Sequence, residues 1–450
     1  MYPVVGRGEC EDTDYDPVAS DRVAGTRGPT TSLGIEHTPV HRQRTTRTKP
    51  TPVGNHILAM APNAWHGPWM NRQQLLSRLA ADGALVVYST GQWYSWDRHD
   101  PAWRAAPAFG RMEHADGVRI AHAARWLMRV PRLPRLDRVS VALEARRLRR
   151  LLPTHARTDL TLYVFHPMFQ PYAEALQPTR LIYHAYDLFA LTPEGTTELA
   201  RQEQWLLDHA DLRIASSEIT AARLEERGGR RVETLPNAAD IHRFDRAHHE
   251  PIPTDLAAIP HPWIGYAGNI NIKVDLALIA ELASRRPQWH FILIGEVGVL
   301  DNTASAALAH CRSLRNVHEL GGKAYTEVPA YVAHLDVGLM SYRIRPDLWT
   351  TALAPLKLYE YLAAGCPVVS AEMGAIDRFR DVVSVAESTD EWEHAIAAAL
   401  NGDDAGSARR RNAVAGHDWS DRVATLQQWL TGLSAPDETL SHPVTADTAS

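Results

Sequence analysis

A lysine and a glutamate one helical turn apart are the residues of this chain best suited to bind a charged ligand. They lie in the segment 354–370, which reads APLKLYEYLAAGCPVVS. Pro355 is typical of the first turn of a helix, and Gly365 is typical of its end. Lys357 and Glu360 then share one helix face. A helix N-terminus with a lysine in its first turn favours a phosphate, and the carboxylate offers two acceptors for a ribose diol.

The same two residues have a simpler interpretation. Lys357 and Glu360 are three positions apart, so they can form an exposed ion pair on the helix surface. Such a pair contributes only about 0.2–0.5 kcal/mol and needs no ligand. The pair by itself leaves both interpretations open.

The elements around this helix alternate between strand and helix patterns. Short apolar runs bounded by turn residues predict strands at 56–60, 84–88, 160–165, 180–183, 212–215, 263–267, 290–294, 337–340 and 367–370, with a further strand at Val317. Helix-like periodicity separates them, for example at 276–285. This alternation predicts an α/β fold with parallel sheets covered by helices on both faces.

The length of 450 residues favours two domains. We expect two doubly wound domains, with a ligand crevice at the carboxyl ends of both sheets. The predicted organisation is a disordered arm at 1–52, an N-terminal domain at 53–240, a proline-rich linker at 241–262, a second domain at 263–410, a C-terminal helix at 411–433 that packs back on the first domain, and a disordered tail at 434–450.

Polar residues at the ends of two predicted strands are the acid–base candidates of the first domain. His184 and Asp187 follow the strand at 180–183, and His166 follows the strand at 160–165. An imidazole or carboxylate within hydrogen-bond reach of an acceptor hydroxyl can take its proton. Each of these residues also has a local alternative, because residues at loop ends often cap helices or bond to the backbone.

Several segments, in chain order from about residue 56 to 432, resemble GT-B glycosyltransferases, especially family-4-like enzymes of the group 1 type. They are WHGPWMNRQQL from Trp65, YHAYD from Tyr183, ADLRIASSE from Ala210, LPNAAD from Leu235, GYAGNINIKVD from Gly265, NVHELG from Asn316, YTEVPAY from Tyr325 and DWSDR from Asp418, together with the helix of Lys357 and Glu360.

The resemblance implies two Rossmann-like domains facing each other across a cleft, with a nucleotide-diphosphate sugar bound by the second. The implied donor-binding residues are Gly268, Asn269, Lys273, Lys357, Leu358 and Glu360. Gly67, Pro68 and Arg72 belong to the loop after the first strand, which approaches the donor diphosphate or the acceptor in such enzymes. The lysines would stabilise the departing diphosphate, so neither a divalent metal nor another cofactor is expected.

One position departs from the family pattern. Family-4 enzymes carry two glutamates eight positions apart, and the second matches Glu360. Ala352 stands where the first glutamate, which usually faces the transferred sugar, is expected. Asp347 is a candidate substitute. Without this glutamate, the resemblance does not imply that the chain uses the retaining mechanism of the family.

Arginine dominates residues 119–150. This segment contains ten arginines but only two acidic residues, Asp137 and Glu144. Apolar residues such as Trp126 lie between the arginines in the sequence. This composition suits an anionic membrane surface or a lipid-diphosphate acceptor, whereas a solvated helix face is the alternative. No nucleic-acid recognition motif accompanies the arginines, and the net charge of −6 gives no general reason to expect such binding.

The cysteines and the N-terminal residues bear on the cellular location of the protein. Three cysteines without partner spacing suggest neither a disulfide framework nor a zinc site. The acidic N-terminal residues lack a signal-peptide pattern, and no apolar run approaches the roughly 20 residues of a membrane span. Asp12 and Asp14 match an Asp-x-Asp metal motif only superficially, because no element holds them. We expect a cytoplasmic protein, peripheral on the inner membrane face.

These observations predict a metal-independent glycosyltransferase that moves a sugar to a hydroxyl of a glycolipid, an oligosaccharide or a growing surface polysaccharide. Two alternatives stay open. One is a catalytically inactive scaffold that binds a sugar nucleotide, which the alanine at position 352 favours. The other is a sugar-nucleotide epimerase on the same fold, which would convert its donor without an acceptor.

Overall fold

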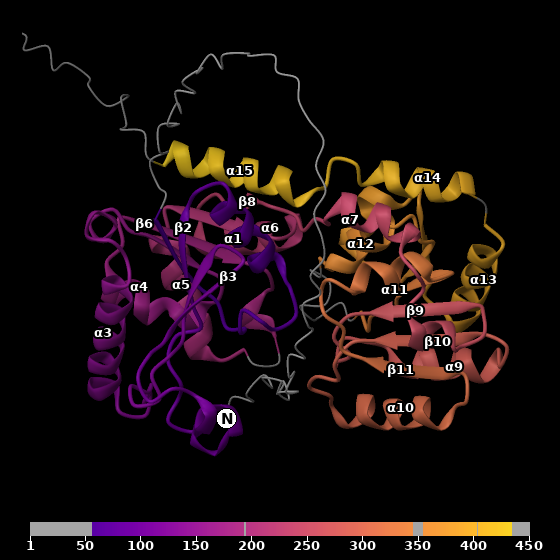
Figure 1. The fold of residues 1–450 in the computed structure, drawn as a ribbon, viewed down its shortest axis with the longest axis horizontal. Coiled ribbons are helices and arrows are strands. Elements are labelled where there is room, and N and C mark those ends of the chain that lie inside the picture. Colours follow the sequence, from indigo (N-terminus) through magenta and orange to yellow (C-terminus); the bar gives the residue numbers. More distant parts are fainter. Residues whose placement is uncertain (1–55, 193–194, 345–353, 403, 434–450) are drawn as a thin grey trace, which may run out of the picture.

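The computed structural model describes residues 56–192, 195–344, 354–402 and 404–433 (Figure 1). The predicted arm at 1–52, the tail at 434–450, Asp347 and Ala352 lie outside these residues. Within them the chain forms two α/β domains that lie side by side.

The first domain is built on an eight-stranded sheet with the strand order β3-β4-β2-β1-β5-β6-β7-β8. The strands are β1 (His56–Met60), β2 (Leu85–Ser89), β3 (Met112–Ala115), β4 (Val118–Ala121), β5 (Thr161–Val164), β6 (Arg180–Ala185), β7 (Leu212–Ala215) and β8 (Glu233–Thr234). Its helices are α1 (Asn71–Ala81), α2 (Pro101–Ala105), α3 (Pro134–Arg150), α4 (Gln170–Leu176), α5 (Thr197–His209) and α6 (Glu218–Gly228). Apolar side chains of α3 to α6 fill one core cluster, and those of α1 fill a second one.

The second domain is built on a six-stranded sheet with the strand order β11-β10-β9-β12-β13-β14. The strands are β9 (Trp263–Ala267), β10 (His290–Ile294), β11 (Val317–Gly321), β12 (Val337–Met340), β13 (Val368–Ser370) and β14 (Val383–Val385), and all their pairs are parallel. Its helices are α9 (Leu276–Arg285), α10 (Asn302–Ser313), α11 (Val328–His334), α12 (Leu356–Ala363), α13 (Thr389–Leu400) and α14 (Asp404–Ala413). Core clusters lie on both faces of this sheet.

The first sheet is not purely parallel, which corrects the prediction. The edge strand β3 is antiparallel to β4, and all other neighbours in this sheet are parallel. Asp116 and Gly117 join the two strands with φ angles of 51° and 77°. An Asp-Gly pair with positive φ at both residues is the preferred two-residue hairpin turn. This signal was in the sequence, but both strands are too short to show a clear alternation.

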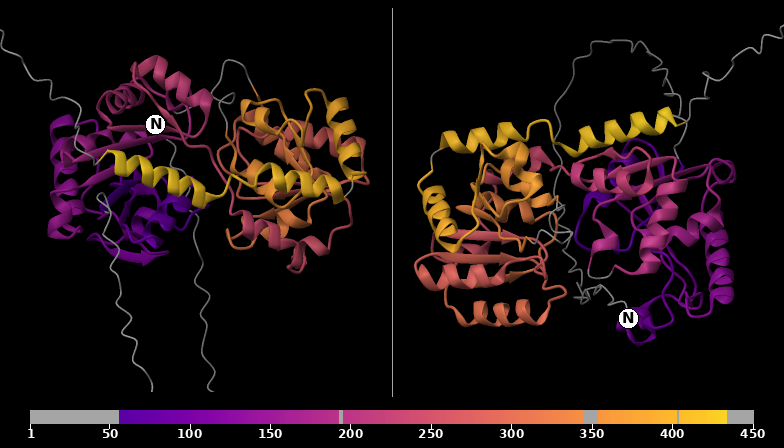
Figure 2. Two further views of the ribbon diagram at one scale, coloured as in Figure 1. Left: turned by 90° about the horizontal axis from the view of Figure 1, so that it is seen from above. Right: turned by 180° about the vertical axis from the view of Figure 1, so that it is seen from behind.

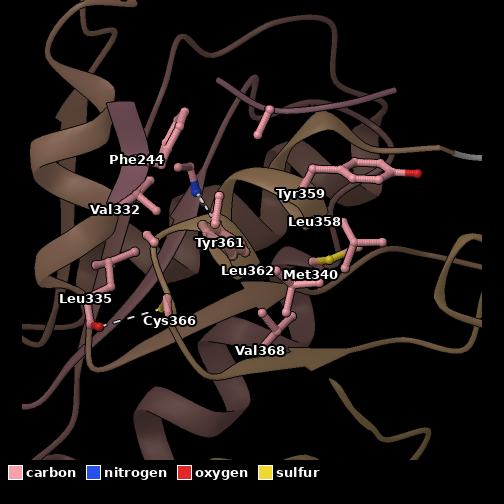
Figure 3. Packing of buried hydrophobic residues seen from close by; sticks show 14 of the residues in the cluster. Phe244, Val332, Leu335, Met340, Leu358, Tyr359, Tyr361, Leu362, Cys366 and Val368 are labelled. Atoms are coloured by element: carbon pink, nitrogen blue, oxygen red, sulfur yellow. Dashed lines mark hydrogen bonds between the residues drawn. The ribbon is translucent and has the colours of Figure 1, made fainter. Parts of the chain in front are cut away.

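The segment 241–262 is a folded part of the second domain rather than a bare linker, which is a second correction. It contains α7 (Ile241–Arg246) and α8 (Thr254–Ala257). Phe244, Ala247 and Leu256 are fully buried in the same core cluster as Tyr361. Figure 3 shows Phe244 among the residues of this cluster. The sequence did not indicate these helices, because each one is short and contributes few apolar residues to the core. The prolines around them favoured the interpretation as a linker.

The C-terminal helix α15 (Trp419–Gly432) returns to the first domain. Trp419, Val423, Leu426 and Leu430 are buried in the core cluster that includes β1 and α1. Figures 1 and 2 show α15 lying along the first domain, whereas α14 lies along the second. The chain therefore crosses between the domains twice.

We expect Phe244→Ala to lower the free energy of unfolding by about 3–5 kcal/mol, because it removes a fully buried ring from the core of the second domain. Phe109→Ala is the matched control, since Phe109 is 80% exposed. Urea denaturation followed by circular dichroism measures both. Equal stability of the two variants would mean that α7 does not contribute to this core.

Candidate active site

Two glycines shape the ends of the central strands of the second domain. Gly268 follows β9 with a φ of 139°, and Gly295 follows β10 with a φ of 152°. A Cβ atom on Gly268 would lie 2.9 Å from Lys357 Nζ, and one on Gly295 would lie 2.1 Å from the carbonyl oxygen of Gly268. The hydroxyl of Tyr361 accepts a hydrogen bond from Ala267 N at 2.8 Å, which fixes the end of β9 to α12. The backbone angles and the lack of room for a Cβ atom mean that positions 268 and 295 both require glycine.

Lys357 is the central charged group of this region. Its residue is 6% exposed, and its Nζ lies 3.1 Å from the ring centroid of Tyr266 and 5.2 Å from that of Tyr342. Among the described residues Nζ has no hydrogen-bond partner. Burial lowers the pKa of Lys357 well below its usual value; Glu360 raises it and Lys273 lowers it further. A buried ammonium without an anionic partner is costly, so the site favours binding of an anion.

Glu360 lies one turn later on the same helix and is partly buried. Burial raises the pKa of its carboxyl group to about 7, and Lys357 opposes this shift. Because Lys357 is buried against Tyr266, the alternative of an exposed Lys357–Glu360 pair on the helix surface is wrong.

An ion pair connects the two domains at this place. Lys273, in the loop between β9 and α9, has its Nζ 3.6 Å from Oδ2 of Asp187, which follows β6 of the first domain. The side chains are 26% and 18% exposed. A residue of the predicted donor site and a predicted catalytic residue therefore meet.

Lysine is rare in this chain, and two of its lysines lie in this region. The lysines are Lys49, Lys273, Lys323 and Lys357. Lys357 and Lys273 are close enough for the charge of Lys273 to lower the pKa of Lys357. The ammonium group is more compact than a guanidinium and suits contact with a single phosphate oxygen.

The two histidines are poor candidates for the catalytic base. His184 is 1% exposed, and its Nδ1 lies 2.9 Å from the Tyr163 hydroxyl inside the first domain. His166 Nδ1 accepts a hydrogen bond from Met168 N and so begins a short helical turn. Burial, and then the charge of Arg72, lower the pKa of both imidazoles to about 3. Neither has the pKa near operating pH that suits a general base, which argues against the predicted role of His184.

Arg72, on the first turn of α1, is the second buried cation. It is 1% exposed, donates from Nη2 to Asn63 Oδ1 at 2.5 Å, and lies 4.9 Å above the ring of Tyr186. Its Nε and Nη1 have no hydrogen-bond partner in the described part of the chain. Gly67 and Pro68 belong to the preceding turn, in which Gly67 N donates to Ala64 O.

Leu358 is not part of this site, contrary to the prediction. Its side chain is fully buried in the core cluster of the second domain, and Figure 3 shows it beside Met340. Its backbone N–H bonds to the carbonyl oxygen of Pro355. Leu358 points from the helix in a different direction than Lys357 and Glu360, so its side chain serves packing. Asn269 does lie at the end of β9, where its side chain would contact any Cβ added to Gly298.

The sequence reasoning missed the aromatic residues of the site. Tyr266 and Tyr342 surround Lys357, and Trp69 of the first domain stacks on Tyr325 of the second at 5.0 Å with an interplanar angle of 8°. The alternation of β9 tells only which face of the sheet carries Tyr266. No local signal in the sequence indicates that a lysine lies on the ring of this tyrosine.

No group of three or more His, Cys, Asp or Glu side chains is arranged to hold a metal ion in the described ranges. No helix in the same ranges combines the length and apolar character of a bilayer span.

Comparison with known proteins finds similarity to glycosyltransferases. The family described as Glycosyl transferases group 1 matches residues 261–402. The teichuronic acid biosynthesis glycosyltransferase TuaH of Bacillus subtilis (strain 168) is 27% identical over 259 residues, which are 54% of this chain. The match spans 64% of the length of TuaH, which is less than two thirds.

Three solved structures share the fold over 84% of this chain and 99% of their own. The sucrose-phosphate synthase of Thermosynechococcus elongatus has a TM-score of 0.62 and 16% identity. The E. coli structure titled trehalose-6-phosphate bound with UDP-2-fluoro glucose has a TM-score of 0.60 and 14% identity, and Anabaena HepE in complex with UDP has 0.58 and 17%. The predicted GT-B fold is confirmed.

We expect Glu360→Gln to gain stability over the wild type as pH rises from 5 to 8. The pKa of Glu360 is about 7 in the folded chain, against 4.5 for an ordinary glutamate. The contribution of Glu360 to wild-type stability is therefore fully present below pH 4.5. It falls by up to about 3 kcal/mol until pH 7, because in this window only the unfolded state loses the proton of Glu360.

Urea titrations at pH 5, 6, 7 and 8 measure this difference. Glu226→Gln is the control, since that side chain is 66% exposed. A constant difference between Glu360→Gln and wild type across this range would contradict the raised pKa.

Proposed function

Because residues 261–402 belong to the glycosyl transferases group 1 family and the chain has the GT-B fold, we propose that this protein transfers a sugar from a nucleotide-diphosphate donor to a hydroxyl group. The observation that carries the proposal is the buried Lys357 of α12, whose Nζ lies next to Gly268 at the end of β9 and has no hydrogen-bond partner among the described residues. A donor diphosphate supplies that partner.

The proposed reaction forms one bond and breaks one. The acceptor oxygen bonds to the anomeric carbon, the bond between this carbon and the diphosphate oxygen breaks, and the acceptor proton leaves to a base or to solvent. Negative charge grows on the departing nucleoside diphosphate. Lys357 and Lys273 stabilise this charge best where water is excluded, and burial of Lys357 provides that condition. We propose that two lysines suffice, without a divalent metal.

Glu360 is the proposed ligand of the donor ribose. Its carboxyl group lies one turn after Lys357 on α12, so a ligand whose phosphate contacts the lysine presents its ribose toward the glutamate. The ionised carboxylate accepts two hydrogen bonds from a diol. Binding therefore favours loss of the proton that the raised pKa of Glu360 retains near pH 7.

Asp187 is the favoured catalytic candidate of the first domain. It reaches the second domain through Lys273, whereas His184 is enclosed between Tyr163 and Phe165. We propose that Asp187 orients Lys273 and lies next to the acceptor hydroxyl. Arg72, whose Nε and Nη1 have no hydrogen-bond partner among the described residues, is the proposed ligand for an anionic group of the acceptor.

The proposed acceptor is a glycolipid, an oligosaccharide or a growing surface polysaccharide, made at the cytoplasmic face of the membrane. The similarity to a glycosyltransferase named for teichuronic acid biosynthesis supports a polysaccharide product. UDP is the first nucleotide to test, because two structures with this fold are titled with UDP or a UDP-sugar.

We expect calorimetry without metal to show binding of one nucleotide among UDP, GDP and TDP. Lys357→Met should weaken this binding by about 10- to 100-fold, the range of a lost charged hydrogen bond, and Glu360→Gln should weaken it by about tenfold. Lys323→Met is the matched control, because Lys323 pairs with Asp255. Wild-type protein that binds no nucleotide, or equal losses in Lys357→Met and Lys323→Met, would refute the donor site.

Nucleotide binding should also take up protons above neutral pH. The pKa of Lys357 is lowered in the free protein, and a diphosphate on Nζ raises it again. Titration at pH 8.5 in two buffers with different ionisation enthalpies measures the uptake. It should disappear in Lys357→Met and persist in Lys323→Met. Equal enthalpies in both buffers for the wild type would show that the ammonium is already fully charged.

A further inference from the structure

The helix α3 exposes apolar side chains and buries acidic ones. Leu136, Val139 and Leu143 are 53%, 56% and 52% exposed, and Leu133 just before the helix is 59% exposed. Leu136, Val139 and Leu143 are spaced at i, i+3 and i+7, so they form one stripe. A surface helix usually turns such a stripe toward the core. Here the stripe faces solvent.

The two acidic residues of α3 are used internally. Asp137 is buried, accepts two hydrogen bonds from Nε and Nη2 of Arg129, and accepts a third from Val130 N. Glu144 is fully buried and accepts two hydrogen bonds from Arg147. Neither carboxylate contributes a negative charge to the outer face of the helix.

The outer face carries only cations beside the apolar stripe. Its exposed arginines are Arg132, Arg135, Arg138, Arg146 and Arg150. This corrects the expectation of a uniform basic surface over residues 119–150, because Arg129 and Arg147 hold the acidic residues of α3 and Arg149 bonds to the carbonyl oxygen of Leu176. Apolar side chains flanked by arginine suit the interface of an anionic bilayer.

A hollow next to α3 extends this surface. It has a volume of about 240 Å³ and is lined by Arg98, Trp103, Arg125, Trp126 and Met128. The carbonyl oxygen of Met128 accepts a hydrogen bond from Ser140 of α3, so the hollow adjoins the helix. Trp126 is 72% exposed. Tryptophan and arginine together favour the headgroup level of a bilayer.

The position of α3 leaves this face accessible. Figures 1 and 2 show α3 at the edge of the first domain that is farthest from the second domain. At 17 residues the helix is about 25 Å long, enough for several lipid headgroups.

We propose that the outer face of α3 docks on an anionic lipid bilayer, with Leu133, Leu136, Val139 and Leu143 inserted among the headgroups and the flanking arginines on lipid phosphates. The occupant is a bilayer rather than a protein, because the exposed face holds one sign of charge along its length. The proposal rests on α3 alone and does not require the donor site.

The test is co-sedimentation of the full chain with vesicles of equal parts phosphatidylglycerol and phosphatidylcholine at low salt. The wild type should bind these vesicles and not pure phosphatidylcholine. Leu136→Ser with Val139→Ser, and separately Arg135→Gln with Arg138→Gln, should each lower the partition coefficient about tenfold or more. Added salt should weaken binding of the wild type more than that of the arginine variant.

Controls use the same substitutions elsewhere. Val297→Ser with Val299→Ser removes side chains that are 42% and 51% exposed in the second domain, and Arg223→Gln with Arg231→Gln removes exposed arginines of the first domain. Both controls should bind vesicles as the wild type does. Nucleotide affinity should be unchanged in every variant, so a failed docking surface is distinguishable from a failed donor site.

Three outcomes would overturn the proposal. The first is no binding of the wild type to anionic vesicles. The second is an equal loss of binding in the control variants. The third is self-association of the wild type in sedimentation velocity that Leu136→Ser with Val139→Ser abolishes while vesicle binding remains, which would assign the face to a second copy.

Discussion

The second domain buries the amine of Lys357 with no hydrogen-bond partner for it among the described residues. Lys357 Nζ lies on the ring of Tyr266, and Gly268 lacks a side chain where any Cβ would contact that Nζ. Tyr361 holds the end of β9 against the helix that carries Lys357. These residues hold the amine of Lys357 in place before a ligand arrives, and a preorganised group needs little rearrangement when negative charge develops next to it.

The contacts between the domains include the ion pair of Lys273 with Asp187 and the stacking of Trp69 on Tyr325. Lys273 serves the first domain through Asp187 while it lies close enough to Lys357 to lower the pKa of that lysine. An anion bound to Lys357 therefore also attracts Lys273.

Most of the second sheet was predictable because its strands are buried apolar runs bounded by glycine and proline. The predicted bounds of β9, β10 and β12 coincide with those in the structure. Helix spacing predicted that Lys357 and Glu360 share one face of α12, but it left open whether they bind a ligand. Burial of His184 and Leu358 and the folded segment 241–262 were not predictable, because each depends on contacts with residues distant in sequence. The exposed stripe of α3 has the same cause, since sequence periodicity cannot tell which face of a helix is outward. The antiparallel strand β3 is local, but it and β4 are too short to show a clear alternation.

The return of the chain to the first domain has a mechanical consequence. The backbone of Ala239 pairs with His417 and Trp419 through two hydrogen bonds, and Asp418 accepts a hydrogen bond from Ile241 N. The outgoing and returning crossings therefore run side by side at one point between the domains. Two crossings tied together by hydrogen bonds restrain the placement of the domains more than one crossing would. Any rotation of one domain against the other has to bend both crossings at this point.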